Sequence, residues 1–224
     1  TNGANVEATG RYGNTGLMLA CSWGHYECVE LLTPTGTDLD IQNEHEETAL
    51  IKASAGGHYS CVALLIQRGA ALNIQDQNGE TALMATCIGR HDECLELLIQ
   101  RGAALDIQDE NEETALMRSS FLGHDECVEL LTQRGAALNI RNEEGRTALM
   151  LASFGGKPEC VELLIQRGAA IDIQDSQGRT ALMLASSGGH HECVELLTQI
   201  GAAIDIQNAQ GETALMLAVY YGRS

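Results

Sequence analysis

The sequence predicts an all-α solenoid, because one unit of 33 residues recurs along nearly the whole chain. Residues 172–204 match the preceding residues 139–171 at 23 of 33 positions. Single residue types also recur at this spacing, and the clearest case is a column of cysteines. The column comprises Cys28, Cys61, Cys94, Cys127, Cys160 and Cys193. Such a period is typical of stacked repeats, in which each unit needs its neighbours to bury its apolar face.

Each unit is predicted to contain two short helices, and residues 172–204 show why. The hydroxyl group of Thr180 can cap a first helix over residues 181–187, and a pair of glycines then ends it. A second helix is predicted over residues 191–199, where apolar residues recur at i, i+3 and i+4 and form one buried stripe. That stripe comprises Cys193, Leu196 and Leu197. A polar, glycine-containing connection follows Gly201 and predicts an extended arm and a turn.

The repeat predicts six full units and partial units at both ends, which we expect to form a single domain over residues 1–224. The full units are residues 7–39, 40–72, 73–105, 106–138, 139–171 and 172–204, the last partial unit is 205–224, and residues 1–6 are the tail of a preceding unit. Neither end has the polar cap typical of terminal repeats, so we expect a segment of a longer array. Glu46 and Glu112 replace a turn glycine found in four other units, which predicts strained turns there.

The repeated unit resembles the ankyrin repeat, and the resemblance covers essentially the whole chain. It is carried by the turn and helix start at residues 76–83, by Gly189-His190 with Leu196-Leu197, and by Gly201-Ala202. It implies helix-turn-helix pairs joined by β-hairpin-like loops. The family signature is Thr-Pro-Leu-His-x-Ala, whereas this chain has Thr-Ala-Leu-Met-x-Ala. Because the family's histidine ties neighbouring loops together and methionine cannot, the resemblance predicts loops that are less rigid here.

The composition excludes several classes of partner. The formal net charge is −18. A chain this acidic lacks the basic surface that phosphate groups require, so we predict no binding to nucleic acid or to anionic membranes. The sequence contains no apolar run of about 18 residues, so it predicts no membrane-spanning helix. No signal peptide is visible at the N-terminus. Equivalent cysteines of stacked units should lie roughly 10 Å apart, too far for disulfides. We therefore expect reduced, buried cysteines and a cytoplasmic, or nuclear, protein.

Two chemical readings of the repeat are weaker than a structural one. The recurring His-x-x-Cys could suggest zinc, but structural zinc needs four converging ligands, and each unit offers two with the cysteine predicted to face the core. A Cys-His nucleophile needs one exposed thiolate, whereas a column repeated six times indicates a scaffold feature. No phosphate loop or nucleotide-binding fingerprint is present. We predict no metal, no cofactor, no catalytic residue and no enzymatic activity.

The positions near the end of each first helix vary while the core columns hardly change, and five of the eight aromatic residues lie there. In the family that this chain resembles, the first helices and turn tips form a concave face that contacts partner proteins. The resemblance therefore implies a protein-binding surface. Its apolar anchors are Trp23, Ile88, Phe121, Leu122 and Phe154, and Arg118 and Leu151 lie on the same face. The turn residues Glu47, Glu80 and Glu113 would attract basic groups of the partner. Arg146 and Arg179 would attract an acidic group. The alternative is that the aromatic residues only fill gaps between neighbouring first helices.

Three functions remain open from the sequence. The first is a scaffold, monomeric in solution, that binds a partner segment with apolar and basic residues on the concave face. The second is a structural spacer or a stack that associates end to end. The third, a metal protein or an enzyme, has the least support. The resemblance also implies possible hydroxylation of the arm asparagines Asn73 and Asn139.

Overall fold

The computed structural model describes residues 7–222. The chain divides into an N-terminal unit, residues 1–110, and a C-terminal unit, residues 111–224, which are described separately. The N-terminal unit contains a 3-10 helix at Arg11–Gly13 and three helix pairs. The pairs are α1 (Gly16–Ser22) with α2 (Tyr26–Leu32), α3 (Ala49–Ala55) with α4 (Tyr59–Gln67), and α5 (Ala82–Gly89) with α6 (Asp92–Gln100).

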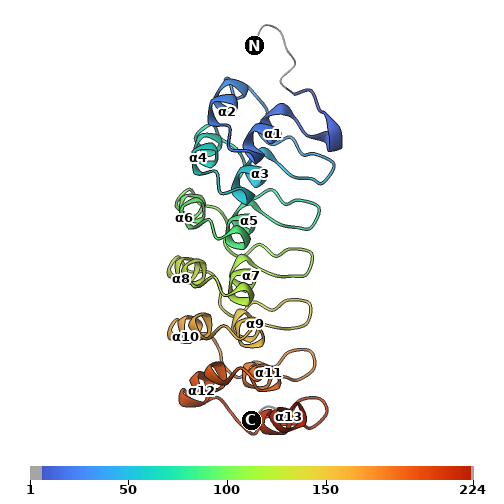
Figure 1. Ribbon diagram of the computed structural model, residues 1–224, viewed down its shortest axis with the longest axis vertical. Helices are drawn as coiled ribbons and strands as arrows, with labels where there is room; N and C mark the ends of the chain where they lie inside the picture. The colour runs from blue at the N-terminus through green and yellow to red at the C-terminus, as the bar shows by residue number, and fades with distance from the viewer. Residues whose placement is uncertain (1–6, 223–224) are drawn as a thin grey trace. The chain divides into compact units, whose positions relative to one another are not determined.

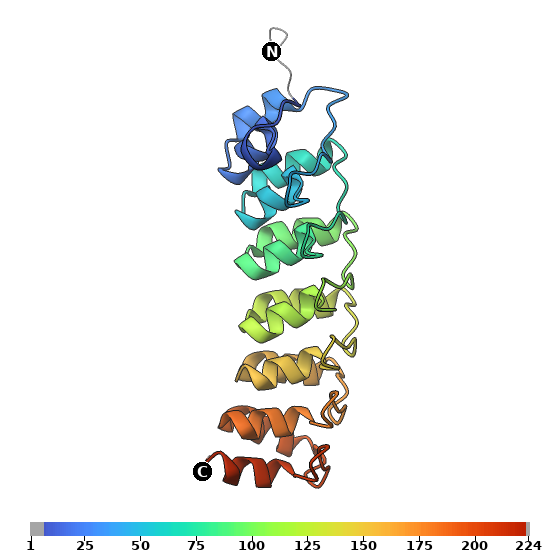
Figure 2. The ribbon, with the colours of Figure 1, turned by 90° about the vertical axis from the view of Figure 1, so that its right-hand side faces the viewer.

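The C-terminal unit repeats the same pairing. Its elements are α7 (Ala115–Leu122) with α8 (Asp125–Gln133), α9 (Ala148–Phe154) with α10 (Pro158–Gln166), α11 (Ala181–Gly188) with α12 (His191–Gln199), and the unpaired α13 (Ala214–Tyr220). In each unit the first helices pack on one another in one column, and the second helices form a column beside them (Figure 1). Each repeat thus forms one layer of its unit (Figure 2). The expected all-α repeat solenoid is confirmed.

Threonine caps every first helix, as the sequence predicts. The hydroxyl oxygen of Thr180 accepts a hydrogen bond from the backbone N–H of Met183 at 3.4 Å, and Thr147 caps Met150 in the same way. Each cap satisfies one of the free N–H groups that begin a helix. The Leu and Met residues that follow lie on the buried faces of the inner first helices, where neighbouring repeats meet.

The turn between the two helices of a repeat is closed by a histidine from the following repeat. A ring N–H of His58 donates to the carbonyl of Ser22 at 3.1 Å, and His190 donates to the carbonyl of Phe154 at the same distance. A Cβ atom at Gly56 would lie 2.5 Å from the His58 ring, so the ring in this position leaves no room for a larger residue at Gly56. The histidine column is therefore structural, as expected.

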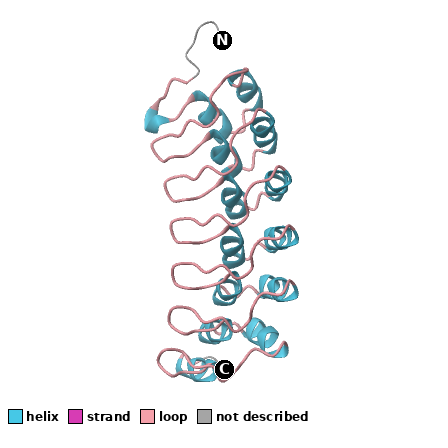
Figure 3. Ribbon diagram, turned by 180° about the vertical axis from the view of Figure 1, so that it is seen from behind, coloured by secondary structure: helices cyan, strands magenta, loops and turns pink. Residues whose placement is uncertain are grey.

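The loops that join the repeats contain no β-strand among the described residues (Figure 3). They are nevertheless tied together by side-chain hydrogen bonds. The side-chain amide of Gln75 donates to Gly79 of its own loop at 2.7 Å and to Gln108 of the next loop at 3.0 Å. Gln174 makes the equivalent pair of bonds. Glutamine in the arm thus connects neighbouring loops in both units of the chain.

Backbone strain occurs where the sequence predicts it and at two further positions, Tyr12, with φ of 59°, and Arg90. Glu46 and Glu112 both have φ of 58°, in the left-handed region where Gly79 and Gly145 stand in other units. Arg90 has φ of 56° at the end of α5, where α7 and α11 end on glycine. The strain at Arg90 was not predicted, although the sequence shows it, because Arg90 replaces a glycine that the other units have at this position.

The cysteines are unpaired, and all but one are buried. Cys28 is exposed, which corrects the prediction that the whole column faces the core. The reason is its position: α2 packs against α1 and α4, and no second helix precedes it among the described residues. The other column members lie on second helices that follow an earlier one.

Candidate protein-binding surface

The centre of the candidate surface in the C-terminal unit is a pair of phenylalanines. Phe121 is the last residue but one of α7, and Phe154 occupies the equivalent position at the end of α9. Their rings stack with centroids 6.3 Å apart and planes inclined by 17°. Each residue also remains 43% exposed. The pair therefore bridges two neighbouring first helices and is still accessible to a partner.

The carbonyl group of Phe154 accepts the hydrogen bond from His190 described above. This bond fixes the backbone at the end of α9, so the position of the Phe154 ring is set by the following repeat. Leu122, next to Phe121, is exposed and widens the apolar area. The surface therefore rests on helix ends that two layers hold in place, which suits a preformed binding site.

Arg146 lies at the edge of this pair. Its guanidinium group is 5.1 Å from the centre of the Phe154 ring, a cation–π contact. Its Nε atom lies 3.6 Å from a carboxylate oxygen of Asp175, beyond hydrogen-bond distance, and has no hydrogen-bond partner although it is buried. Arg146 thus retains one donor that no acceptor in its own chain satisfies.

Arg179 does not have such a free donor. Its Nη2 and Nε atoms lie 2.7 Å and 2.9 Å from the Asp175 carboxylate, whose side chain is fully buried. Burial alone would raise the pKa of Asp175, but the hydrogen bonds from Arg179 and Gln177 hold the pKa below its usual value. Arg146 and Arg179, which the sequence predicts to attract an acid of a partner, therefore both already face Asp175 of their own chain.

The acidic turn residues are also paired within the chain. Glu113 forms an ion pair of 3.1 Å with Arg118, and Glu47 forms one with Lys52. Burial would raise the pKa of Glu47, but hydrogen bonds from Lys52 and Asn43 outweigh it and lower the pKa. Lys52 was overlooked as a partner of Glu47. The spacing could have revealed it, because a basic residue follows the turn glutamate by five positions in both units.

Leu151 must be removed from the surface. It is only 4% exposed, although Arg118 at the equivalent position of the preceding repeat is half-buried. The apolar side chain packs between neighbouring first helices, whereas the charged one extends to Glu113. The sequence places both residues on one helix face but does not say how far each reaches toward solvent.

The predicted residues of the N-terminal unit do not form one cluster. Trp23 caps the end of α1 and is 73% exposed, and Ile88 is exposed on α5. α3 packs between these helices and presents Ala55 and Gly56 in the same column. Glu80 is half-buried in its turn. Leu19, which the sequence analysis did not single out, is exposed one helical turn before Trp23 and extends its apolar area.

The arm asparagines bind the next arm. Asn73 accepts a hydrogen bond from the backbone N–H of Ala104 at 3.0 Å, and Asn139 accepts one from Ala170 at the same distance. Both residues are exposed. Their side-chain carbonyls are therefore engaged while the rest of each side chain faces solvent.

Among the described residues, no group of three or more histidine, cysteine or acidic side chains could hold a metal ion. None of the helices in that part of the chain is long and apolar enough to cross a membrane. Burial raises the pKa of Cys21 and of Cys160 to about 12, with smaller contributions from Cys61 to the former and Asp125 to the latter. Thiols with so high a pKa are poor nucleophiles.

A family model described as ankyrin repeats (3 copies) matches residues 2–76, 65–142, 98–175 and 149–224. The chain belongs to the ankyrin repeat family. Among solved structures it is similar to the ankyrin repeat domain of Bcl-3, a member of the IkappaB family, with 32% identity, a TM-score of 0.84 and coverage of 92% of this chain and 94% of that one. It is also similar to the human ASB11 ankyrin repeat domain, with 28% identity, a TM-score of 0.83 and coverage of 92% of each chain. A comparison with curated protein sequences finds no match.

Ankyrin repeat domains are in general protein–protein interaction modules. Their fold is a scaffold that in general carries no enzymatic activity. The class of function expected from the sequence is therefore supported at the level of the family.

Proposed function

We propose that this protein is an interaction scaffold that binds a segment of another protein on the face formed by its first helices and turn tips, the concave face in this family. The observation that carries the proposal is the stacked pair Phe121 and Phe154, which stays 43% exposed although it sits on two inner helices. Large rings held rigidly at a surface supply much of the affinity at protein interfaces. Trp23 and Leu122 would provide further apolar contacts.

The partner segment is expected to combine apolar and basic residues. Its apolar side chains would cover the phenylalanine pair. Because Glu47 and Glu113 are already paired with Lys52 and Arg118, basic groups of the partner would act mainly through the overall charge of −18, which speeds encounter with a cationic segment.

A double substitution of Phe121 and Phe154 by alanine tests the proposal. Proteins captured from cell extract by the unmodified chain should bind the variant more weakly by about 1–3 kcal/mol for each ring that acts as a hot spot. Tyr59→Ala is the matched control, because Tyr59 is as exposed, at 45%, but lies on a second helix. Equal capture by both variants, with unchanged circular dichroism, would remove the phenylalanine pair from the binding surface.

A structural spacer or self-associating stack is the second candidate, and α13 gives it one specific support. Leu215 and Met216 of α13 are 73% and 55% exposed, whereas the equivalent Leu182 and Met183 of α11 are buried against the next repeat. A second copy could cover this face. Sedimentation velocity decides between the candidates, since an s-value that rises with protein concentration supports stacking and a constant monomer value supports the scaffold.

The same proposal extends to the remaining properties of the chain. It acts without a cofactor or metal and without catalysis, as a monomer that binds neither nucleic acid nor membranes. It works in a reducing compartment, the cytoplasm or the nucleus, because its eight cysteines are unpaired. Asn73 and Asn139 are its candidates for hydroxylation, supported by their exposure, and peptide mass spectrometry of protein from cells would detect the added oxygen.

A further inference from the structure

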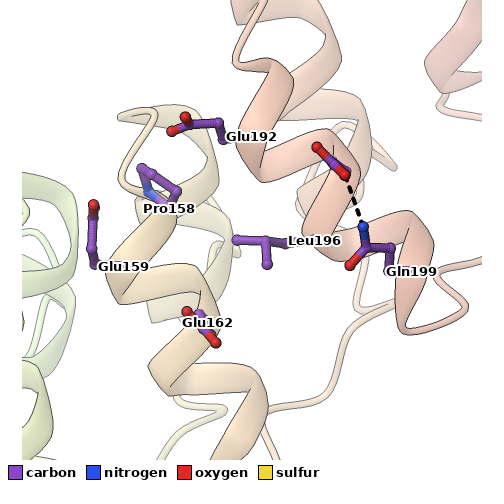
Figure 4. A pocket seen from close by; sticks show the side chains of 7 residues that line it. Pro158, Glu159, Glu162, Glu192, Leu196 and Gln199 are labelled. Carbon is purple, nitrogen blue, oxygen red and sulfur yellow. Dashed lines mark hydrogen bonds between the residues drawn. The ribbon is translucent and has the colours of Figure 1, made fainter.

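A groove runs between the second helices α10 and α12 of the C-terminal unit (Figure 4). It encloses about 290 Å³, with Pro158 and Leu196 as its apolar part. Leu196 points from α12 toward α10 (Figure 4). A second cavity of about 350 Å³ shares Pro158 and Glu192 with the first and is also lined by His190 and His191. The two cavities therefore form one surface along α10 and α12.

Four glutamates surround the apolar part of this groove. Glu159 and Glu162 come from α10, and Glu192 and Glu195 come from α12. None of the four has an ion pair within the described chain: Glu162 and Glu195 each accept one hydrogen bond, from Gln166 and Gln199, and neither helix contains Lys or Arg. Their negative charge is therefore uncompensated.

The nearest lysine does not neutralise the groove. Lys157 precedes α10, but its side chain extends along Gly123, at the turn between α7 and α8. The pKa of the Cys193 thiol, at the base of the groove, is raised to about 11, first by burial and then by the negative charges of Glu192 and Glu159. The field of these two glutamates therefore extends to the base of the groove. A cation placed in this groove would meet four carboxylates and no competing positive group on either helix.

The chain itself shows that this charge is not needed for folding. The groove between α4 and α6 also encloses about 290 Å³ and is lined by Tyr59, Glu93, Glu96, Leu97 and Gln100. α4 carries Ser60 and Ala63 at the positions equivalent to Glu159 and Glu162. The same packing of two second helices thus forms with half the carboxylates. The glutamate pair on α10, which recurs on α2, α6, α8 and α12, is therefore not required for this packing.

We propose that the α10–α12 groove binds a basic, amphipathic segment of a partner protein. Arginine or lysine side chains of that segment lay their aliphatic parts on Pro158 and Leu196 and place their charged groups between the glutamates of the two helices. Such side chains combine an apolar stem with a cationic end, which matches the two kinds of surface in the groove. This second surface is separate from the phenylalanine pair and does not depend on it.

The test uses the full chain and a fluorescein-labelled peptide of repeated Arg-Leu-Ala-Arg, with fluorescence anisotropy as the readout. Glu159→Ser with Glu162→Ala reproduces the residues of α4, so the fold is expected to persist, and far-UV circular dichroism checks it. This variant should weaken binding of the peptide about tenfold, because two favourable ion pairs are lost. Leu196→Ala should weaken it several-fold, through loss of the apolar contact.

Two controls separate this proposal from general attraction to an acidic protein. Glu143→Gln with Asp205→Asn removes the same two charges from exposed loops of the same unit and should change affinity by less than about twofold. Phe121→Ala with Phe154→Ala should leave binding of this peptide unchanged, whatever it does to the partner of the phenylalanine pair. An equal loss in the loop variant and the groove variant, or no loss on Leu196→Ala, would overturn the proposal.

Discussion

Ser120 and Ser153 occupy equivalent positions on α7 and α9, and both are fully buried, yet only one of them makes a hydrogen bond. The hydroxyl of Ser153 donates to the carbonyl of Leu149 at 2.7 Å. The hydroxyl of Ser120 has no partner, and the same is true of Ser54 on α3. A buried polar group without a partner costs about 1–3 kcal/mol of stability. The serine hydroxyl at this repeated position therefore destabilises the fold in one repeat and stabilises it in the next.

Alanine substitution at the two serines should therefore give opposite results. Ser153→Ala is expected to lower the free energy of unfolding by about 1 kcal/mol, since it removes a satisfied hydrogen bond. Ser120→Ala should leave that free energy unchanged or raise it, because the desolvated hydroxyl is lost. Urea denaturation of both variants measures the difference, with an unchanged m-value showing that the transition is comparable. A loss at Ser120 as large as the loss at Ser153 would show that the Ser120 hydroxyl has a partner after all.

At the scale of the structural element, the turn that precedes each first helix is organised by one acidic or amide side chain. Asp175 and Asp76 each accept hydrogen bonds from two backbone N–H groups of their own turn, at 2.8–2.9 Å. Only Asp175 also binds arginine, because Arg179 stands where the equivalent turn has Glu80. The two turns therefore share their backbone geometry and differ in electrostatics.

Asp175→Asn keeps the shape of this turn and removes its charge. Since the folded-state pKa of Asp175 lies below the ordinary value of about 4, the carboxylate contributes stability above that pH, and the contribution is lost as pH falls through the lowered pKa. The variant should be less stable than the unmodified chain by about 2 kcal/mol at neutral pH, and the two should converge in acid. Urea titrations from pH 7 downward measure this.

The control for this prediction lies in the N-terminal unit. Asp76→Asn makes the same isosteric change in a turn without arginine, so its effect on stability at neutral pH should be smaller than that of Asp175→Asn. If Asp76→Asn and Asp175→Asn behave alike, the arginine contacts of Asp175 do not contribute to stability.

Helices, caps and glycine turns were predictable from the sequence because their causes are local. Thr180 caps its helix through a residue three positions away, and Glu46 is forced to positive φ by its own turn. What could not be predicted depends on contacts across a repeat. The burial of Leu151, the exposure of Cys28 and the loop bridge made by Gln75 are all set by residues of a neighbouring layer.

The candidate site shows the same division. The exposed positions Phe121, Phe154 and Trp23 follow from their place at the end of first helices. The pairing of Arg146 and Arg179 with Asp175 was missed, because Asp175 was assigned to the turn and its buried side chain is visible only in the structure. Charge patterns along a repeat thus indicate which residues lie near a surface but do not show which of them are already neutralised.

At the scale of the whole molecule, the burial of the cysteine thiols shows which contacts between helices exclude solvent. Seven of the eight cysteines are buried, and Cys28 alone is exposed. The buried ones lie at or beside the contacts between helices, where burial raises the pKa of Cys94 to about 11 and that of Cys160 to about 12. They can react only after the helices around them separate, whereas Cys28 needs no such opening.

Reaction with Ellman's reagent at pH 8 should therefore have two phases. One thiol of eight should react at once in the native protein, and the remaining seven should react slowly, at rates that rise with urea as local opening becomes easier. Cys28→Ser should abolish the fast phase and leave the slow rates unchanged, because the substitution is small and exposed. A fast phase of several thiols would mean that the helix pairs open readily, since no other described cysteine is exposed in the closed fold.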